Sequence, residues 1–133
     1  MFKKNKTIIA IIIFTLLLTF LFPNTGDDWM WGSEAGEALL KNWFSDYNGR
    51  YAGNIIVMML TRSRLLRMIV MTLVILGTIY LCSKIVNKEK KELFLVGFML
   101  FLAIPILTFR QAVVWTSGFT NYFISLFLTI SYF

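Results

Sequence analysis

The sequence contains no histidine and a single cysteine, Cys82. The first absence excludes histidine-ligated metal sites and Cys/His nucleophile pairs, and the second excludes zinc clusters and intramolecular disulfides. Charged residues are also scarce, because they make up 15% of the 133 residues, against about a quarter in soluble domains. Acid–base chemistry therefore falls to Asp, Glu, Lys or Tyr. Since 58% of the residues are hydrophobic, the expected solvent is a membrane.

The net charge of +6 does not indicate a nucleic-acid partner. The basic residues lie at the ends of apolar runs and are not gathered on one polar segment with interleaved aromatic residues. This placement is typical of anchoring to a lipid bilayer with anionic headgroups.

Four apolar runs divide the chain. The second and third are long enough to be membrane helices, and the first is slightly short but could span with the help of flanking Lys6 and Trp29. A cleaved signal peptide is the alternative for the first run, but no small-residue cleavage site of the usual kind follows it, so we favour an uncleaved span. The fold class expected is all-α integral membrane, with three transmembrane helices and the start of a fourth. The expected spans are residues 7–22, 65–83, 93–109 and 119–133 of a single membrane domain.

Lysines set the expected orientation. They precede the first span and fill the connector 84–92, so the positive-inside rule places both segments in the cytoplasm and the loop 23–64 outside. The outer position of Arg62, Arg64 and Arg67 argues mildly against this assignment. The expected location is a bacterial plasma membrane with a cytoplasmic N-terminus. The lysines concerned are Lys3, Lys4, Lys6, Lys84, Lys88, Lys90 and Lys91.

The last apolar run is still in progress at Phe133. A terminal carboxylate within a bilayer is costly, because a charge there costs at least ~2.5 kcal/mol. We therefore expect the chain to be the N-terminal part of a longer multi-pass protein.

The outer loop contains an amphipathic pattern over residues 34–47, "EAGEALLKNWFSDY". Its apolar residues recur at three- and four-residue steps, which predicts a helix with one apolar face. Ser33 is the expected N-cap and Asn48-Gly49 the expected stop. The helix could lie on the outer leaflet or pack on the rest of the protein. Residues 52–61 are too few to cross a bilayer, so they form either a surface helix or an outward extension of the second span.

Adjacent carboxylates, Asp27 and Asp28, follow the first span after four residues, beside Trp29 and Trp31. Two acids can simply end a helix at the membrane surface and stay solvated. The functional alternative is that one acts as a general base towards a sugar hydroxyl, or as a ligand of a divalent cation. The tryptophans fit either interpretation, as interfacial aromatics or as platforms on which a sugar stacks.

Two further stretches could contribute to a binding site. Arg62, Arg64 and Arg67 could contact lipid phosphates simply by snorkelling, or they could recognise a lipid-linked phosphate donor. The segment "RQAVVWTSGFTNYF", residues 110–123, combines aromatic and amide side chains. It could line a carbohydrate site or form an interfacial turn, and nothing within it decides between the two.

Three short motifs carry a resemblance through their order: "GDDW" after the first span, "YNGRYAGN" before the second and "WTSGFTNYF" before the fourth. Together they resemble the N-terminal region of a bacterial multi-pass family that is similar to GT-C-type glycosyltransferases, including O-antigen glucosyltransferase-like proteins. A proline expected after the Asn-Tyr pair is missing here, where Phe123 follows.

The resemblance implies sugar transfer from a polyprenyl-phosphate donor at the outer membrane face. It implies an acidic pair at Asp27 and Asp28, a structural or phosphate-facing Arg50, and an outer pocket that includes Asn121 and Tyr122. Trp115 is a further candidate for substrate binding in the same loop. The rival hypothesis is a non-catalytic accessory subunit or a transporter fragment, in which the acids serve topology alone.

Overall fold

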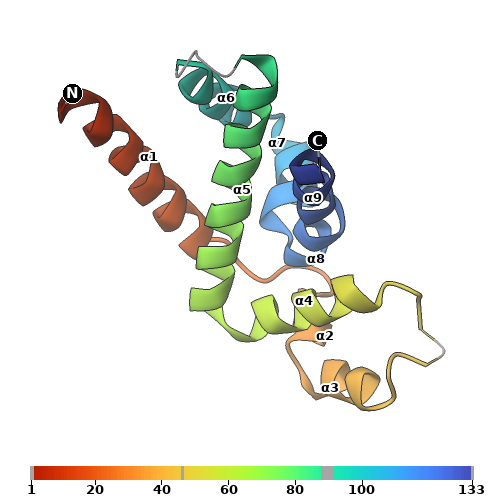
Figure 1. The fold of residues 1–133 in the computed structure, drawn as a ribbon. Coiled ribbons are helices and arrows are strands. Elements are labelled where there is room, and N and C mark those ends of the chain that lie inside the picture. The colour runs from red at the N-terminus through yellow and green to blue at the C-terminus, as the bar shows by residue number, and fades with distance from the viewer. Residues whose placement is uncertain (1, 46, 88–91, 133) are drawn as a thin grey trace.

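The computed structural model describes residues 2–45, 47–87 and 92–132, with side chains from Lys6 onward (Figure 1). The residues so described form helices and turns and contain no strand, which confirms the all-helical expectation. The elements are α1 (Phe2–Phe20), α2 (Asp28–Trp31), α3 (Glu34–Lys41), α4 (Tyr51–Arg62), α5 (Arg64–Val86), α6 (Glu92–Leu102), α7 (Ile106–Phe109), the π-helix η1 (Arg110–Val114), α8 (Thr116–Gly118), the π-helix η2 (Phe119–Ile124) and α9 (Ser125–Tyr132).

Helix α5 is the one element of the described chain that is by itself long and apolar enough to cross a membrane. It has 23 residues and contains the whole predicted second span, 65–83. The predicted first span coincides with a shorter apolar helix, Lys6–Phe20. By length and composition, the described chain thus has one membrane-crossing helix, or two elements if the bent α6–η1 pair is one span.

The predicted third span, 93–109, is broken. Helix α6 and the segment Ile106–Val114 meet at an angle of 96°, and as a bent pair they would form a second membrane-crossing element or a re-entrant loop. Pro105 lies at the break with extended backbone, because proline has no N–H to continue the helix. The predicted fourth run begins earlier than expected, at Thr116, and continues through α8, η2 and α9.

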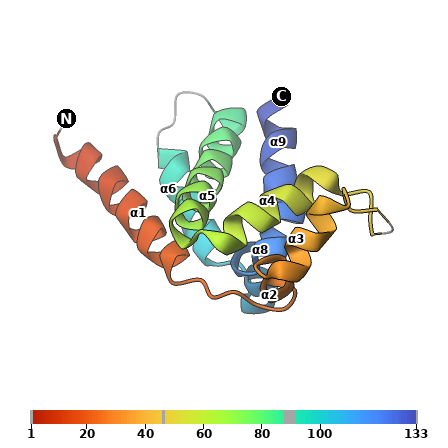
Figure 2. The same ribbon diagram turned by 90° about the horizontal axis from the view of Figure 1, so that it is seen from below.

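Apolar side chains from α1, α5, α6, η1 and η2 form the larger core. Met71, Ile75 and Phe119 are fully buried at its centre. Helices α1 and α5 are joined by a hydrogen bond between the hydroxyls of Thr19 and Thr72 (2.9 Å). Figures 1 and 2 show the N-terminal half of α1 diverging from α5, and much of its apolar surface is exposed.

Helix α4 is a separate surface helix, so the alternative of an extended second span is wrong. The chain turns at Ser63, whose backbone is extended (φ −126°, ψ 103°). The Ser63 hydroxyl then accepts a hydrogen bond from the N–H of Leu66 at 3.2 Å and caps α5, which is the usual role of an N-cap serine.

Helix α3 begins as predicted, with Ser33 as its N-cap, but it ends at Lys41, so the predicted extent to Tyr47 is wrong. Trp43 and Phe44 adopt positive φ angles of 51° and 54°. Their N–H groups donate to the carbonyls of Leu40 (2.9 Å) and Leu39 (2.7 Å), which is the Schellman arrangement. This turn buries Phe44 beside Trp31, Val57 and Met58, so α3 packs on the protein. Asp46 lies outside the described residues.

The described helix ends next to the lysine-rich segments lie at one end of the molecule (Figure 1). Figure 1 shows the start of α1, the end of α5 and the start of α6 at this end, and α2, α3 and α4 at the opposite end. Lys84 belongs to the described chain, whereas Lys88, Lys90, Lys91 and the side chains of Lys3 and Lys4 lie outside it.

Candidate functional site

Asp28 is completely buried and acts as a clamp between two distant segments. Its Oδ1 accepts hydrogen bonds from the N–H and the hydroxyl of Ser117, at 3.0 and 2.9 Å. Its Oδ2 accepts from the N–H of Thr116 at 3.1 Å and from the N–H of Thr25 at 3.2 Å. Both oxygens are thus occupied by donors of the protein itself.

The clamp has a simple physical cause. The backbone at Trp115 is extended (ψ 116°), so a new helix starts at Thr116 with free N–H groups. These groups need acceptors, and a carboxylate at a helix N-terminus also interacts favourably with the helix dipole. Asp28 supplies this acceptor from across the molecule and fixes where α8 begins.

Asp27 faces elsewhere. It is exposed, and its Oδ1 accepts a hydrogen bond from the indole N–H of Trp115 at 2.9 Å. Gly26 precedes it with a positive φ of 58°, and a Cβ atom there would lie 3.5 Å from the indole nitrogen. The described chain offers no second partner to this carboxylate, so Oδ2 can bind a ligand.

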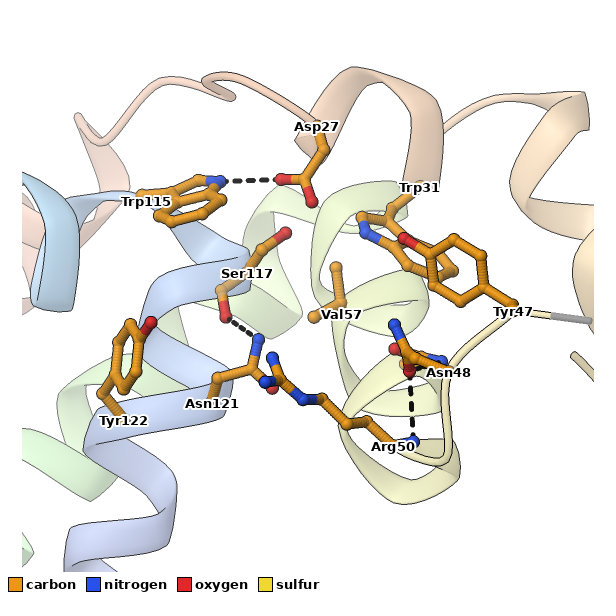
Figure 3. Close-up of a pocket in the computed structure, with 11 residues that line it drawn as sticks. Asp27, Trp31, Tyr47, Asn48, Arg50, Val57, Trp115, Ser117, Asn121 and Tyr122 are labelled. Carbon is orange, nitrogen blue, oxygen red and sulfur yellow. Dashed lines mark hydrogen bonds between the residues drawn. The ribbon is translucent and has the colours of Figure 1, made fainter.

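A pocket of about 130 Å³ opens beside Asp27. Figure 3 shows Asp27, Trp31 and Trp115 along one side of it, with Tyr122 and Arg50 further round and Ser117, Asn121 and Val57 between them. Three segments that are distant in the sequence build this pocket. Its lining residues are Asp27, Trp31, Tyr47, Asn48, Arg50, Asn54, Val57, Trp115, Ser117, Asn121 and Tyr122.

A second cavity of about 370 Å³ adjoins the first and shares Arg50, Asn121 and Tyr122 with it. It lies between α4 and the η2–α9 segment, and Ile56, Ile124 and Leu128 contribute apolar surface to it. The polar pocket therefore continues into a more apolar groove.

The helices approach closely where the two cavities meet. A Cβ atom added to Gly53 of α4 would lie 3.2 Å from the amide oxygen of Asn121. Asn121 is held from its other side, because its amide nitrogen donates to the carbonyl of Ser117 at 2.8 Å. This asparagine lines both the pocket and the groove.

The three arginines considered for phosphate binding contact the protein itself. Arg62 donates to the carbonyls of Ser33 (2.8 Å) and Met58 (3.2 Å). Arg64 donates to the carbonyl of Phe20 at 2.9 Å. The bond from Arg64 satisfies the Phe20 carbonyl at the end of α1, where helix carbonyls lack intrahelical donors.

Arg67 is the most buried of the three, with 4% of its surface exposed. It donates to the carbonyl of Phe22 at 2.9 Å and to the side chain of Asn24. It therefore fixes the segment that follows α1, and none of the three arginines lines either cavity.

The structure brings together part of the predicted site. Asp27, Arg50, Trp115, Asn121 and Tyr122 share the pocket, whereas Asp28 lies behind it. Trp29 is 67% exposed and lines neither cavity. Sequence reasoning missed four polar or aromatic lining residues, although all of them lie within or beside the motifs it singled out. They are Tyr47, Asn48, Asn54 and Ser117.

A divalent cation does not fit the donor set well. Among the described residues no group of three or more acidic or cysteine side chains converges on one point. Asp27 would be the only carboxylate available, since both oxygens of Asp28 already accept hydrogen bonds. We therefore derive no step that depends on a protein-held metal.

Comparison of the chain with protein-family models, with curated proteins and with solved structures finds no match.

Proposed function

We propose that this chain belongs to a multi-pass protein of the bacterial plasma membrane that transfers a sugar from a lipid-phosphate donor at the outer membrane face. The observation that carries this proposal is the meeting of the three ordered motifs at one pocket, where Asp27 presents a carboxylate among aromatic and amide side chains. Aromatic faces with a few directed polar groups are typical of small-molecule sites.

Asp27 is the proposed general base. It would take the proton from an acceptor hydroxyl as that oxygen attacks the anomeric carbon of the sugar. The bond between this carbon and the donor phosphate oxygen breaks, and the electron pair leaves with the lipid phosphate. A positioned base of this kind contributes about 10²–10⁴-fold to a reaction rate.

Arg50 is the proposed phosphate-facing residue. In Figure 3 its side chain extends from the start of α4 towards Asn121, and it borders both cavities. Its guanidinium makes no hydrogen bond or ion pair within the described part of the chain, unlike those of Arg62, Arg64 and Arg67. Arginine suits phosphate because its planar group can donate two parallel hydrogen bonds.

The membrane part of the proposal assigns α1, α5, the bent α6–η1 segment and the α8–α9 segment to the bilayer. Exposed apolar side chains cover α1 and α6, including Ile13, Leu17, Met99 and Leu100, and a bilayer would cover them. The N-terminus would be cytoplasmic and the pocket external, with anionic headgroups near the lysines.

Sugar transfer tests the role of Asp27. Membranes from cells that express the full-length gene product are incubated with polyprenyl-phosphate-linked glucose, galactose or mannose, and transferred sugar is measured. Asp27→Asn should lower transfer about 100-fold or more, while Glu34→Gln, an exposed acid at the start of α3, should leave it unchanged. Full transfer by the Asp27→Asn protein would refute the proposed base.

Thiol labelling in intact cells tests the topology. Cys82 is the sole cysteine and lies near the predicted inner end of α5. It should resist a membrane-impermeant maleimide, whereas Gly49→Cys, introduced where nothing lies within 4 Å, should react. The reverse pattern would overturn the orientation, and labelling at both positions would contradict the membrane span.

A further inference from the structure

The hydroxyl of Ser117 can serve the pocket only as an acceptor. A serine hydroxyl has one hydrogen to donate and two lone pairs. Ser117 gives this hydrogen to the carboxylate of Asp28 at 2.9 Å. A ligand that meets this oxygen must therefore bring its own donor.

The same reasoning applies to Asn54. The side-chain oxygen of Asn48 accepts a hydrogen bond from the backbone N–H of Arg50 at 3.1 Å, and a backbone N–H can only donate. This fixes the orientation of the Asn48 amide, so the nitrogen of Asn54 must be the donor in the 3.2 Å contact with the same oxygen. The carbonyl oxygen of the nearly buried Asn54 remains available as an acceptor.

The pocket consequently offers two kinds of polar group to a ligand. Asp27 before α2, Ser117 in α8 and Asn54 in α4 offer acceptors. The amide nitrogen of Asn48 and the guanidinium of Arg50, in the loop before α4, offer donors. A matching ligand carries hydroxyl donors together with an acceptor or anionic group.

The size of the pocket limits the ligand further. An engineered protein cavity of about 150 Å³ holds one benzene ring. The present pocket, with about 130 Å³, is therefore matched to a single six-membered ring that partly protrudes from its open mouth.

We propose that Ser117 and Asn54 are specificity-determining residues that accept hydrogen bonds from hydroxyl groups of one bound sugar ring, whose anionic substituent faces Arg50. The sugar nature of the ring rests on the proposed function. The polarity of the two residues rests on hydrogen bonds within the protein alone. An analogue that lacks the matching hydroxyl leaves a nearly buried acceptor unpaired, which lowers affinity.

Binding of soluble probes tests this inference without an activity assay. The full chain is purified into lipid nanodiscs, and calorimetry measures the affinity of the 1-phosphates of glucose, galactose and mannose. For the tightest of these, monodeoxy derivatives are then measured at each ring position. At least one derivative should bind about 10-fold more weakly than its parent.

Ser117→Ala provides the residue-specific test. The variant should bind the parent probe about 10-fold more weakly than the wild type does. For the one deoxy derivative that lacks the hydroxyl bound by Ser117, the variant and the wild type should have the same affinity. A loss of stability alone would weaken all probes equally. Thr129→Ala, which removes an exposed hydroxyl on α9 that bonds only within its own helix, is the matched control and should bind like the wild type.

Asn54→Asp keeps the acceptor and removes the amide donor, so it should retain the preference for the parent over the deoxy probe, whereas Asn54→Leu should lose it.

Equal binding of all deoxy probes, or no binding of any hexose 1-phosphate below about 10 mM, overturns the inference. Sugar binding as expected, combined with undiminished transfer by the Asp27→Asn protein, would instead refute the proposed function and leave this inference standing.

Discussion

Asp27 and Asp28 are adjacent in the chain but belong to two different regions of the molecule. Asp28 lies in a buried junction, where donors from Thr25, Thr116 and Ser117 surround its carboxylate. Asp27 lies at the surface, where its carboxylate meets one indole N–H and an open pocket. Two adjacent acids in a sequence can therefore have different roles, one stabilising the site from within and the other facing the pocket.

Removal of the buried carboxylate should have the largest effect. Asp28→Ala leaves the N–H groups of Thr116 and Ser117 without an acceptor in the interior, so it should lower the free energy of unfolding by about 3–5 kcal/mol. Asp27→Ala, which loses one exposed hydrogen bond, should cost less than about 1 kcal/mol. Thermal unfolding of the purified protein in detergent, followed by circular dichroism, gives both values. Equal destabilisation by the two variants would contradict the assignment of a structural role to Asp28 and not to Asp27.

The packing of the junction can be tested at Gly118. A Cβ atom there would lie 1.9 Å from the carbonyl oxygen of Gln111 and 2.8 Å from the ring of Trp115. Gly118→Ala should therefore cost at least about 2 kcal/mol, although alanine is the better helix former. Gly49→Ala adds the same methyl group where nothing lies within 4 Å and should change stability by less than about 0.5 kcal/mol. If both variants unfolded alike, the close contact between η1 and α8 would be wrong.

Two arginines allow the same comparison between a ligand-facing and a structural charge, because Arg50 lines the pocket and Arg62 bonds to the protein itself. Arg50→Gln should weaken the binding of undecaprenyl phosphate about 10-fold, since a charge-assisted contact to phosphate is worth about 1.5–3 kcal/mol. Arg62→Gln should change this affinity less than about twofold, because its guanidinium already donates to the carbonyls of Ser33 and Met58. Binding is measured by fluorescence titration in detergent. A larger loss for Arg62→Gln than for Arg50→Gln would restore the arginine cluster as the phosphate site.

Part of this architecture could be predicted from the sequence. Hydrophobic composition and the long run 65–83 predict helices and identify α5, and Ser33 identifies the start of α3, because these signals are local. The order of the three motifs predicts that Asp27, Arg50, Trp115, Asn121 and Tyr122 belong together, and the structure brings them to one pocket.

The rest depends on contacts between distant segments. Which acid is buried is decided by the start of α8, whose free N–H groups lie far along the chain from Asp28. The early end of α3 depends on two aromatic residues with positive φ, a conformation that glycine or asparagine usually adopts. Arg62 and Arg67 donate to the carbonyls of Ser33 and Phe22, which are distant in the sequence, so no local pattern predicts these bonds.

The indole N–H signals of the four tryptophans test the central claim most directly, because Asp27 is the hydrogen-bond acceptor of only one of them, Trp115. In a ¹⁵N–¹H correlation spectrum of the labelled protein in detergent, the Trp115 signal is assigned by its absence in Trp115→Phe. Asp27→Asn should shift this signal upfield as the charged acceptor is lost, while the signals of the exposed Trp29 and Trp43 should stay in place. A Trp115 signal that is unchanged in Asp27→Asn would contradict the account.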